Sequence, residues 1–291
     1  MEKIGFIIGE SSSISKKEVK NFNAAQIPFI LDWEEGDKLQ GDNIFQKMVE
    51  ADKKNIKNFA KTSQPSPFVF KKIFAKELKK FEKIIFISIS SKLSGTYNSA
   101  LQAKKMLEKE NQKKVFIFDS LNADVAEILF IFFADKLRKE GKSVEEIIKI
   151  LEDKVSKVYL IGMLGNPKWL EAGGRLGHSK ATILRKMQKI GMRPILGMVS
   201  GEIKPIALKM QAKNMSMAIF KHFKSEIEKI KDYKKIKIAI SHADNLKGAK
   251  ELRNEIEKSF ERAEIVSFNI SSFVIGSHIG PGSIICAWTL Q

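Results

Sequence analysis

Hydroxyl-bearing and glycine residues gather in three short segments where the apolar periodicity of the chain pauses. The segments are TSQPSP at 62–67, SSKLSGTYNSA at 90–100 and GSHIGPGS at 276–283. The hydroxyl groups of Thr62, Ser63 and Ser94 and the imidazole of His278 can donate hydrogen bonds to a carboxylate or a phosphate. These residue types indicate an anion-binding site whose parts come from three distant segments.

Ser94 and Gly95 follow an apolar run, KIIFISIS at 83–90, that predicts a buried strand. We expect them just beyond the carboxyl end of this strand, where open α/β sheets bind ligands. A helix should begin there, and its first N–H groups are unpaired and suit an anion. Small polar residues also begin many helices that bind nothing, so plain helix capping is the alternative.

The other two segments also have structural interpretations. Ser66 is predicted to cap a helix that has Pro67 in its first turn, which leaves the hydroxyl groups of Thr62 and Ser63 available for a ligand. His278 stands between glycines, and we expect a loop there that lets the backbone approach a ligand closely. A histidine with a purely structural role is the alternative.

A serine on a strand-to-helix turn, together with a histidine, also suggests an acyl hydrolase. The nucleophile-elbow pattern Gly-x-Ser-x-Gly requires a glycine two residues before Ser94, where the chain has Lys92. No acidic partner for His278 is evident from the sequence. We therefore keep acyl hydrolysis as an alternative and expect no catalytic residue in this chain.

A further glycine-rich stretch, EAGGRLGHSK at 171–180, could bind a phosphate through backbone N–H groups and Arg175. Its structural interpretation is a helix that ends at Gly173 and a connecting segment. Elsewhere, His178, His222 and His242 lack the spacing of metal ligands, so we expect no metal site. The single cysteine stands in the apolar run SIICAW, which disfavours thiol chemistry.

The elements that position these segments follow from the alternation of short β-rich runs with amphipathic stretches. Strands are predicted at 4–9, 27–31, 83–90, 113–118 and 158–164, and helices at 42–54, 67–80, 97–110, 124–140 and 144–155. Such alternation is typical of a parallel sheet covered by helices. Ser143 and Glu146 form a capping box for the last helix, and the apolar run from Ile128 to Ala134 is predicted to be a buried helix.

After about residue 157 the pattern changes. The strand-like runs RPILGMVSG, EIKPIAL, KIKIAIS, EIVSF and IICAW are interrupted by helical stretches near 212–231 and 246–260. A chain of 291 residues is long enough for two domains. We therefore expect an α/β protein with an N-terminal parallel-sheet, Rossmann-like domain at 1–157 and a C-terminal mixed-sheet α/β domain at 158–291. Their interface is the expected ligand site.

The formal net charge of +17 makes nucleic-acid binding a further alternative. Arginine, whose planar fork suits bases and phosphates, supplies only six of the 51 basic residues, and the lysines are spread along the helical stretches. We expect a solvated basic surface with general affinity for anions. The most apolar run is too short to span a membrane and no export signal is present, so the cytoplasm is the expected compartment.

Six motifs occur in one order along the chain: TSQPSP, ISSKLSGTYNSA, VFIFDS, LEAGGRLG, RPIL with GEIKP, and GSHIGPG. In order and approximate spacing they resemble the DegV family, also called FakB-type fatty-acid-binding proteins, over nearly the whole chain. The resemblance implies a two-domain α/β fold with a long apolar tunnel that encloses one long-chain fatty acid. The carboxylate of the acid is expected near the domain junction.

The resemblance also implies site residues. Thr62 and Ser94 match the carboxylate-binding hydroxyls of the family, His278 matches the histidine of its HxGPG loop, and Arg175 matches the arginine of GGR near the carboxylate end. With the neighbouring residues included, the expected carboxylate site is Thr62, Ser63, Ser94, Gly95 and His278. Arg175 is expected to contact a partner or a phosphate.

In FakB-type systems a separate kinase phosphorylates the bound acid with ATP. The resemblance thus implies a binding protein with a fatty acid as ligand, a fatty acid kinase as partner, and no cofactor or catalytic activity of its own. Two motifs depart from the family pattern. The chain has Glu10, Ser11 and Ser12 where the family usually has DSS, and Leu208, Lys209 and Met210 where it commonly has K-x-R.

Overall fold

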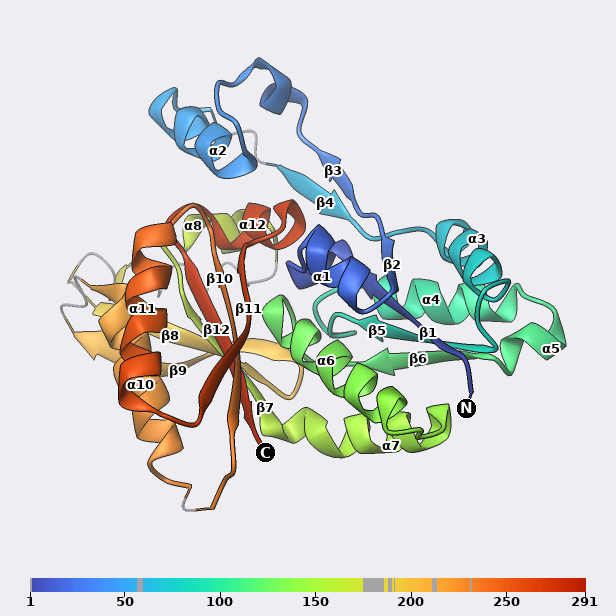
Figure 1. Cartoon of the computed structure of the whole chain (residues 1–291). Coiled ribbons are helices and arrows are strands. Elements are labelled where there is room, and N and C mark those ends of the chain that lie inside the picture. Colours follow the sequence, from blue (N-terminus) through green and yellow to red (C-terminus); the bar gives the residue numbers. More distant parts are fainter. Residues whose placement is uncertain are drawn as a thin grey trace.

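The computed structural model describes residues 2–56, 60–174, 186–187, 190, 192–210, 214–230 and 232–291. It contains two large sheets that lie next to each other, each with helices packed on it (Figure 1). A small two-stranded sheet projects from this body and carries a helix at its outer end (Figure 1).

The first large sheet is parallel throughout and has the strand order β2-β1-β5-β6. Its strands are β1 (Ile4–Gly9), β2 (Ala24–Ile27), β5 (Lys83–Ser88) and β6 (Val115–Asp119). Helices α3 (Pro67–Glu77) and α4 (Thr96–Lys105) cover one face, and α6 (Val125–Lys139) and α7 (Val144–Lys154) cover the other. Because side chains alternate along a strand, Phe86 and Ile87 enter two different cores.

Local signals for the helix starts act as the sequence predicts. Ser66 caps α3 by accepting a hydrogen bond from Val69 N, and Pro67 occupies the first turn. Ser143 and Glu146 form a capping box at the start of α7. The predicted helix over 97–110 is instead two helices, α4 and the short α5 (Lys109–Gln112).

A projecting arm follows β2 and consists of β3 (Ile30–Asp32), α2 (Ile44–Lys53) and β4 (Lys61–Ser63) (Figure 1). The single strand predicted at 27–31 is therefore wrong. Pro28 has no N–H for a ladder hydrogen bond, so β2 ends at Ile27 and the chain leaves the first sheet there. The sequence did not reveal that the next strand pairs with β4, because this pairing joins residues about 30 positions apart.

The second large sheet is mixed and has the order β11-β10-β12-β7-β8-β9. Its strands are β7 (Val158–Met163), β8 (Met192–Val199), β9 (Glu202–Met210), β10 (Ile236–His242), β11 (Ala263–Ile270) and β12 (Ile284–Leu290). Only the β10–β11 pair is parallel among its described pairs. Helices α10 (Met215–Ile227) and α11 (Leu246–Ser259) pack on one face, around Phe223 and Trp288.

The helix α6 contacts both large sheets. It packs against β1 and β5 of the first sheet and against β7, β10, β11 and β12 of the second. All residues from Ile128 to Ala134 except Phe132 are buried, which confirms the predicted buried helix. A helix that is apolar on nearly every side is stable in water only when it is covered on every side, and the two sheets provide that cover.

The predicted fold class, an α/β protein with a parallel sheet followed by a mixed sheet, is confirmed. The division at 157/158 stays a prediction, which we adopt as a proposal. The sequence did not predict the short helices α1 (Lys16–Asn21) and α12 (Phe273–Ile279), nor the 3-10 turns at Glu10–Ser12, Glu34–Lys38 and Val155–Lys157, whereas the helix offered as one interpretation of the stretch before Gly173 is present as α8 (Lys168–Ala172).

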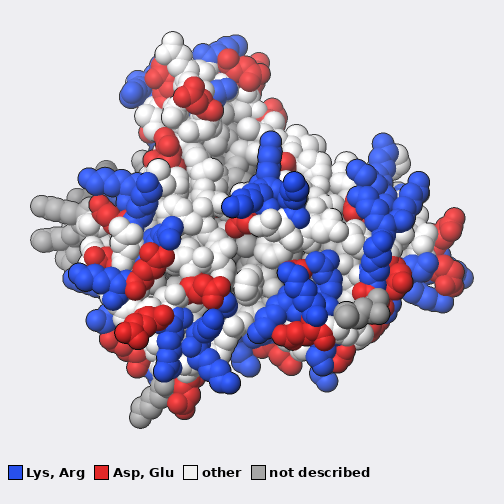
Figure 2. Space-filling view, viewed as in Figure 1, with Lys and Arg blue, Asp and Glu red and all other residues white. Residues whose placement is uncertain are grey.

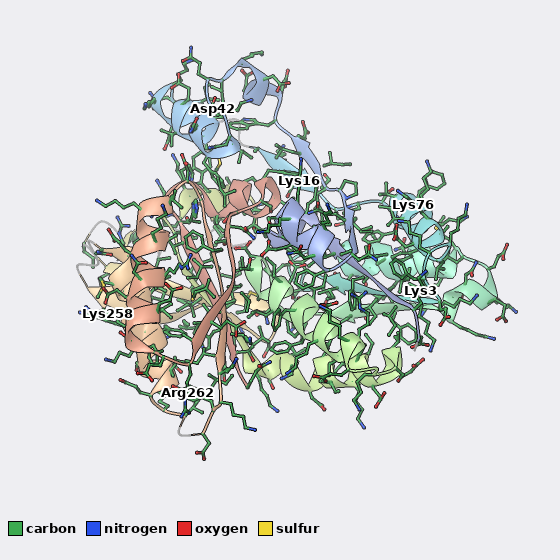
Figure 3. The ribbon with its side chains drawn as sticks, in the orientation of Figure 1. Lys3, Lys16, Asp42, Lys76, Lys258 and Arg262 are labelled. Carbon is green, nitrogen blue, oxygen red and sulfur yellow. The ribbon has the colours of Figure 1, made fainter. Side chains whose placement is uncertain are left out.

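Charged side chains of both signs are interspersed on the face shown in Figure 2. Exposed charged residues such as Asp42, Lys76 and Lys258 lie at separate outer edges of the molecule (Figure 3). Several lysines pair with a glutamate one helical turn away, as Lys80 does with Glu77 at 2.7 Å. No helix in the described ranges is both long enough and apolar enough to cross a bilayer.

The first prediction concerns the burial of α6. Phe130 is fully buried and its ring centroid lies 5.1 Å from that of Phe118. Phe130→Ala is expected to lower the free energy of unfolding by roughly 3–5 kcal/mol, because a large cavity replaces the ring. Phe132→Ala, at a partly buried position of the same helix, is the matched control and should cost clearly less in denaturant titration. Equal losses would contradict the packing described here.

Candidate functional site

His278 does not lie in a loop, so that expectation is wrong. It is in the last turn of α12, is only 8% exposed, and precedes the loop that begins at Gly280. Ser272 caps this helix by accepting a hydrogen bond from Ile275 N at 3.3 Å. The glycines around His278 did not predict a helix, because Gly276 lowers helix propensity in the sequence but serves close packing in the structure.

Thr62 meets His278 although 216 positions separate them in the chain. Thr62 Oγ1 lies 2.8 Å from His278 Nε2, within hydrogen-bond distance. Thr62 belongs to β4 of the arm, so the arm supplies part of the site. The arm is held in place by α2, whose Phe45 packs so closely on α12 that a Cβ atom at Gly276 would lie 2.5 Å from its ring. Asp52 of α2 also pairs with Lys168 of α8.

Ser94 lies between β5 and α4, as predicted. Its Oγ lies 2.7 Å from Thr96 Oγ1 and accepts a hydrogen bond from Thr96 N at 3.3 Å. Gly95 precedes α4 and lies against Gln64, where a Cβ atom at Gly95 would approach Gln64 Nε2 to 2.4 Å. The polar groups of the arm and of the β5–α4 loop therefore adjoin one another.

A narrow cavity links these polar groups to the interior. Its volume, counted as the space that the centre of a water-sized sphere can reach, is about 90 Å³. One water molecule needs roughly 10–15 Å³ by the same measure, so the cavity is several times larger. Thr62, Gln64, Ser94 and His278 line it, whereas the exposed Ser63 and the neighbouring Gly95 are not among its lining residues.

Most of the cavity wall is apolar and comes from segments that follow strands of the first sheet and from strands of the second sheet together with α8 and α12. Ile89 and Leu93 contribute from the first half of the chain, and Leu160, Met198, Ile203 and Ile285 contribute from the second. The arrangement is thus a slot with an apolar wall and a cluster of hydrogen-bonding side chains. A slot of this kind suits a long apolar molecule that carries one polar or charged group.

Two glycines let α8 and α12 come together beside His278. A Cβ atom at Gly173 would lie 2.0 Å from His278 Nδ1, and one at Gly280 would lie 2.0 Å from the ring of Trp169. Gly280 also has a φ of 74°, which favours glycine. The helix predicted to end at Gly173 does so, as α8. Arg175 and His178 lie outside the described residues.

In the first of the two motifs that differ from the family pattern, Glu10 makes a hydrogen bond. Its Oε2 accepts a hydrogen bond from Phe29 N at 2.8 Å, and Phe29 lines the cavity. The other departing motif ends β9, where the backbone of Met210 pairs with Met192. Among the described residues, no group of three or more His, Cys, Asp and Glu side chains could hold a metal ion.

Sequence reasoning missed two buried carboxyl groups, Asp124 and Glu127, which lie at the start of α6. Both are essentially inaccessible to solvent, and Asp124 lines the cavity. Asp124 accepts hydrogen bonds from Ser13 Oγ and Ser241 Oγ, and Glu127 accepts one from Ser11 Oγ at 3.3 Å. Glu127 Oε1 has no hydrogen-bond partner among the described residues. One acidic residue just before the most apolar helix and a second in its first turn were a usable signal in the sequence.

Burial governs the ionisation of this pair. It raises the pKa of Asp124 to about 6, although the hydrogen bonds from Ser13 and Ser241 act in the opposite direction. Burial also raises the pKa of Glu127 well above its usual value of 4.5, and the neighbouring Asp124 charge raises it further. Asp124 in addition has a φ of 53°, a left-handed conformation that is uncommon outside glycine. The site therefore contains, beside its apolar slot, a carboxyl group whose burial and backbone conformation reduce the stability of the fold.

Comparison with known proteins gives matches over nearly the whole chain. The model of the DegV family of uncharacterised proteins matches residues 3–289. A DegV domain-containing protein of Halalkalibacterium halodurans is 29% identical, with 100% of both chains covered. A protein of Thermotoga maritima named fatty acid-binding protein is 27% identical, covering 97% of this chain and 96% of its own. A DegV family protein of Thermus thermophilus, whose structure is described as showing fatty acid binding, has a TM-score of 0.86 at 22% identity and covers 99% of this chain and 100% of its own.

The second prediction concerns pH and the buried pair. Because the pKa of Glu127 is higher in the folded than in the unfolded state, its contribution to stability is complete below about pH 4.5 and is lost as the pH rises through the folded-state value. Glu127→Gln cannot ionise, so the free energy of unfolding of the variant should rise relative to that of the wild type as the pH rises from 5 to 8. Melting temperatures over this range test the effect.

The control is Glu140→Gln, which changes an exposed carboxyl group at the end of the same helix. Its difference from the wild type should stay nearly constant across the same pH range. A difference between Glu127→Gln and the wild type that does not change with pH would show that Glu127 ionises in the folded protein as it does in water.

Proposed function

The chain belongs to the DegV family, and on that premise we propose that it binds a long-chain fatty acid in the cavity between its two large sheets. The observation that carries the proposal is the apolar slot lined by Thr62, Ser94 and His278. The name of the Thermotoga maritima relative and the description of the Thermus thermophilus structure support a fatty acid as the ligand class.

The acyl chain provides the affinity in this proposal. Burying one methylene group contributes roughly 0.8 kcal/mol, so about fourteen methylenes contribute on the order of 11 kcal/mol before the cost of ordering the ligand. An ionised carboxylate would offset much of this gain if nothing replaced its hydration. Hydrogen-bond donors at one part of the slot therefore decide which way the acid enters.

Thr62, Ser94 and His278 are the residues that we assign to the carboxylate, with Ser63 and Gly95 beside them. If His278 Nε2 donates to Thr62 Oγ1 across their 2.8 Å contact, the Thr62 hydroxyl proton stays available for the ligand, and His278 acts on the carboxylate through Thr62. The N-terminus of α4 adds unpaired N–H groups and a partial positive charge next to Ser94. Arg175 is our candidate for contact with a partner or a phosphate.

We further propose that the protein is a carrier and not a catalyst. In this proposal it acts in the cytoplasm, needs no cofactor, and presents the carboxylate to a separate fatty acid kinase that forms the acyl phosphate. The hydroxyl of Ser94 is engaged with Thr96, which favours a binding role over that of an activated nucleophile. The two halves of the chain, 1–157 and 158–291, act as the two sides of the slot.

The third prediction tests ligand binding directly. Protein purified under mild conditions is expected to carry a fatty acid that mass spectrometry detects after denaturation. Ser94→Ala combined with His278→Ala should weaken the binding of added palmitate by roughly 10-fold or more, because one donor to the carboxylate and the imidazole that orients the Thr62 hydroxyl are lost. Protein that is lipid-free and takes up no palmitate would rule out the proposed function. Unchanged affinity in the double variant would remove these residues from the site.

The fourth prediction separates a carrier from a hydrolase. The wild type should release p-nitrophenol from p-nitrophenyl palmitate no faster than Ser94→Ala does, at the rate of an unrelated protein. A rate well above this background that Ser94→Ala abolishes would identify Ser94 as a nucleophile and favour acyl hydrolysis. Lys92→Ala, which changes an exposed neighbour, is the matched control.

A further inference from the structure

A series of buried hydrogen bonds reaches α12 from the end opposite His278. The backbone N–H of Ser272, the residue that caps α12, donates to Ser13 Oγ at 2.8 Å. Ser13 Oγ in turn donates to Asp124 Oδ1 at the start of α6. These bonds connect the helix that lies between the two sheets to the helix that carries His278.

Asp124 fixes the orientation of the Ser13 hydroxyl. An ionised carboxylate only accepts hydrogen bonds, so Ser13 must point its proton at Asp124 and offer its lone pairs to Ser272 N. Ser241 Oγ of β10 donates to the other oxygen, Asp124 Oδ2, which holds the carboxyl group in place from the side of the second sheet. Ser13 is 4% exposed, which limits the access of water to its hydroxyl group.

Because α12 is short, the hydrogen bond at Ser272 also constrains the position of His278. Six residues separate Ser272 from His278, a rise of roughly 9 Å in an α-helix. A helix of two turns moves as a rigid unit, so a displacement at Ser272 reaches the imidazole. Only a small displacement of the imidazole is compatible with its contacts, because Nε2 lies 2.8 Å from Thr62 Oγ1 while Gly173 packs against the other nitrogen.

The cost of Asp124 favours a role beyond packing. Its carboxyl group is 1% exposed and its backbone has a φ of 53°. A buried carboxyl group, even one that accepts hydrogen bonds from two serines, and a left-handed aspartate each reduce stability, and such costs persist mainly at functional sites. Glu127, beside it, also remains incompletely hydrogen-bonded among the described residues.

We propose that Asp124 and Ser13 are positioning residues for the ligand carboxylate, acting through the N-terminus of α12 on His278. The inference rests on the proposed fatty-acid site and adds two residues to it that do not touch the carboxylate. They affect the binding of the ligand carboxylate and leave the apolar contacts between the slot and the acyl chain unchanged.

The test compares two ligands that share an acyl chain, palmitate and hexadecanol. Ser13→Ala removes both bonds of the hydroxyl and should weaken palmitate binding by roughly 5-fold while hexadecanol binding stays within about 2-fold. Ser12→Ala is the matched control. Ser12 is an adjacent and equally buried serine whose hydroxyl donates to Gly9 O at 2.8 Å, away from α12, and both affinities should stay at wild-type values.

Equal losses for both ligands in Ser13→Ala would overturn the inference, because a purely structural role weakens the whole slot. No loss for either ligand would overturn it as well. If the wild type fails to bind palmitate at all, the proposed function itself fails, which is a different and recognisable result.

Variants of Asp124 test the other member of the pair. Asp124→Ala should lower the ratio of palmitate to hexadecanol affinity by roughly 5-fold, and Asp124→Asn should keep it within about 2-fold because the amide oxygen still accepts from Ser13. The ratio is used because Asp124 lines the cavity and its loss changes the wall for both ligands. An asparagine variant as defective as the alanine variant would overturn the proposed hydrogen-bond mechanism, as would an unchanged ratio in Asp124→Ala.

A second measurement covers the case in which Ser13→Ala is unstable. The imidazole resonances of His278, assigned with His278→Gln, should shift in Ser13→Ala and not in Ser12→Ala, in ligand-free protein at low temperature. An unmoved His278 signal in Ser13→Ala would overturn the inference independently of any affinity.

Discussion

The burial of α6 between two sheets is the constraint on which the rest of the structure depends. Its apolar side chains contact strands of the first sheet on one side and of the second on the other. Each sheet therefore has one face that is fully covered only when the other half of the chain packs against it. The ligand slot lies beside the start of this helix, since Ala123 and Asp124, the two residues before α6, line it.

The start of this enclosed helix is polar. The carboxyl group of Asp124, the N-cap residue, accepts hydrogen bonds from Ser13 and Ser241, one from each half of the chain. These three side chains form a hydrogen-bonded polar cluster in an otherwise apolar layer. Burial raises the pKa of Asp124 and of Glu127, and the hydrogen bonds from the serines act in the opposite direction.

The polar end of the slot is assembled at short range by residues with small or absent side chains. Gly173, Gly276 and Gly280 let α8, α2 and α12 approach more closely than any side chain would allow. This packing brings Thr62 of the arm to His278. The members of the site come from β4, from the loop before α4 and from α12, and each is hydrogen-bonded within the protein. Such preorganisation reduces the ordering cost of binding.

The sequence by itself determined the fold class, the family, the caps of α3 and α7, and the buried character of α6, because these depend on periodicity, local hydrogen bonds and a motif order that spans the chain. It also named Thr62, Ser94 and His278. Only the tertiary structure decided that His278 is helical, that an arm brings Thr62 to it, and that Asp124 lies beside the slot. The reason is physical: contacts such as that between Thr62 and His278, which are 216 positions apart, depend on how sheets and helices pack and leave no periodic trace in the chain.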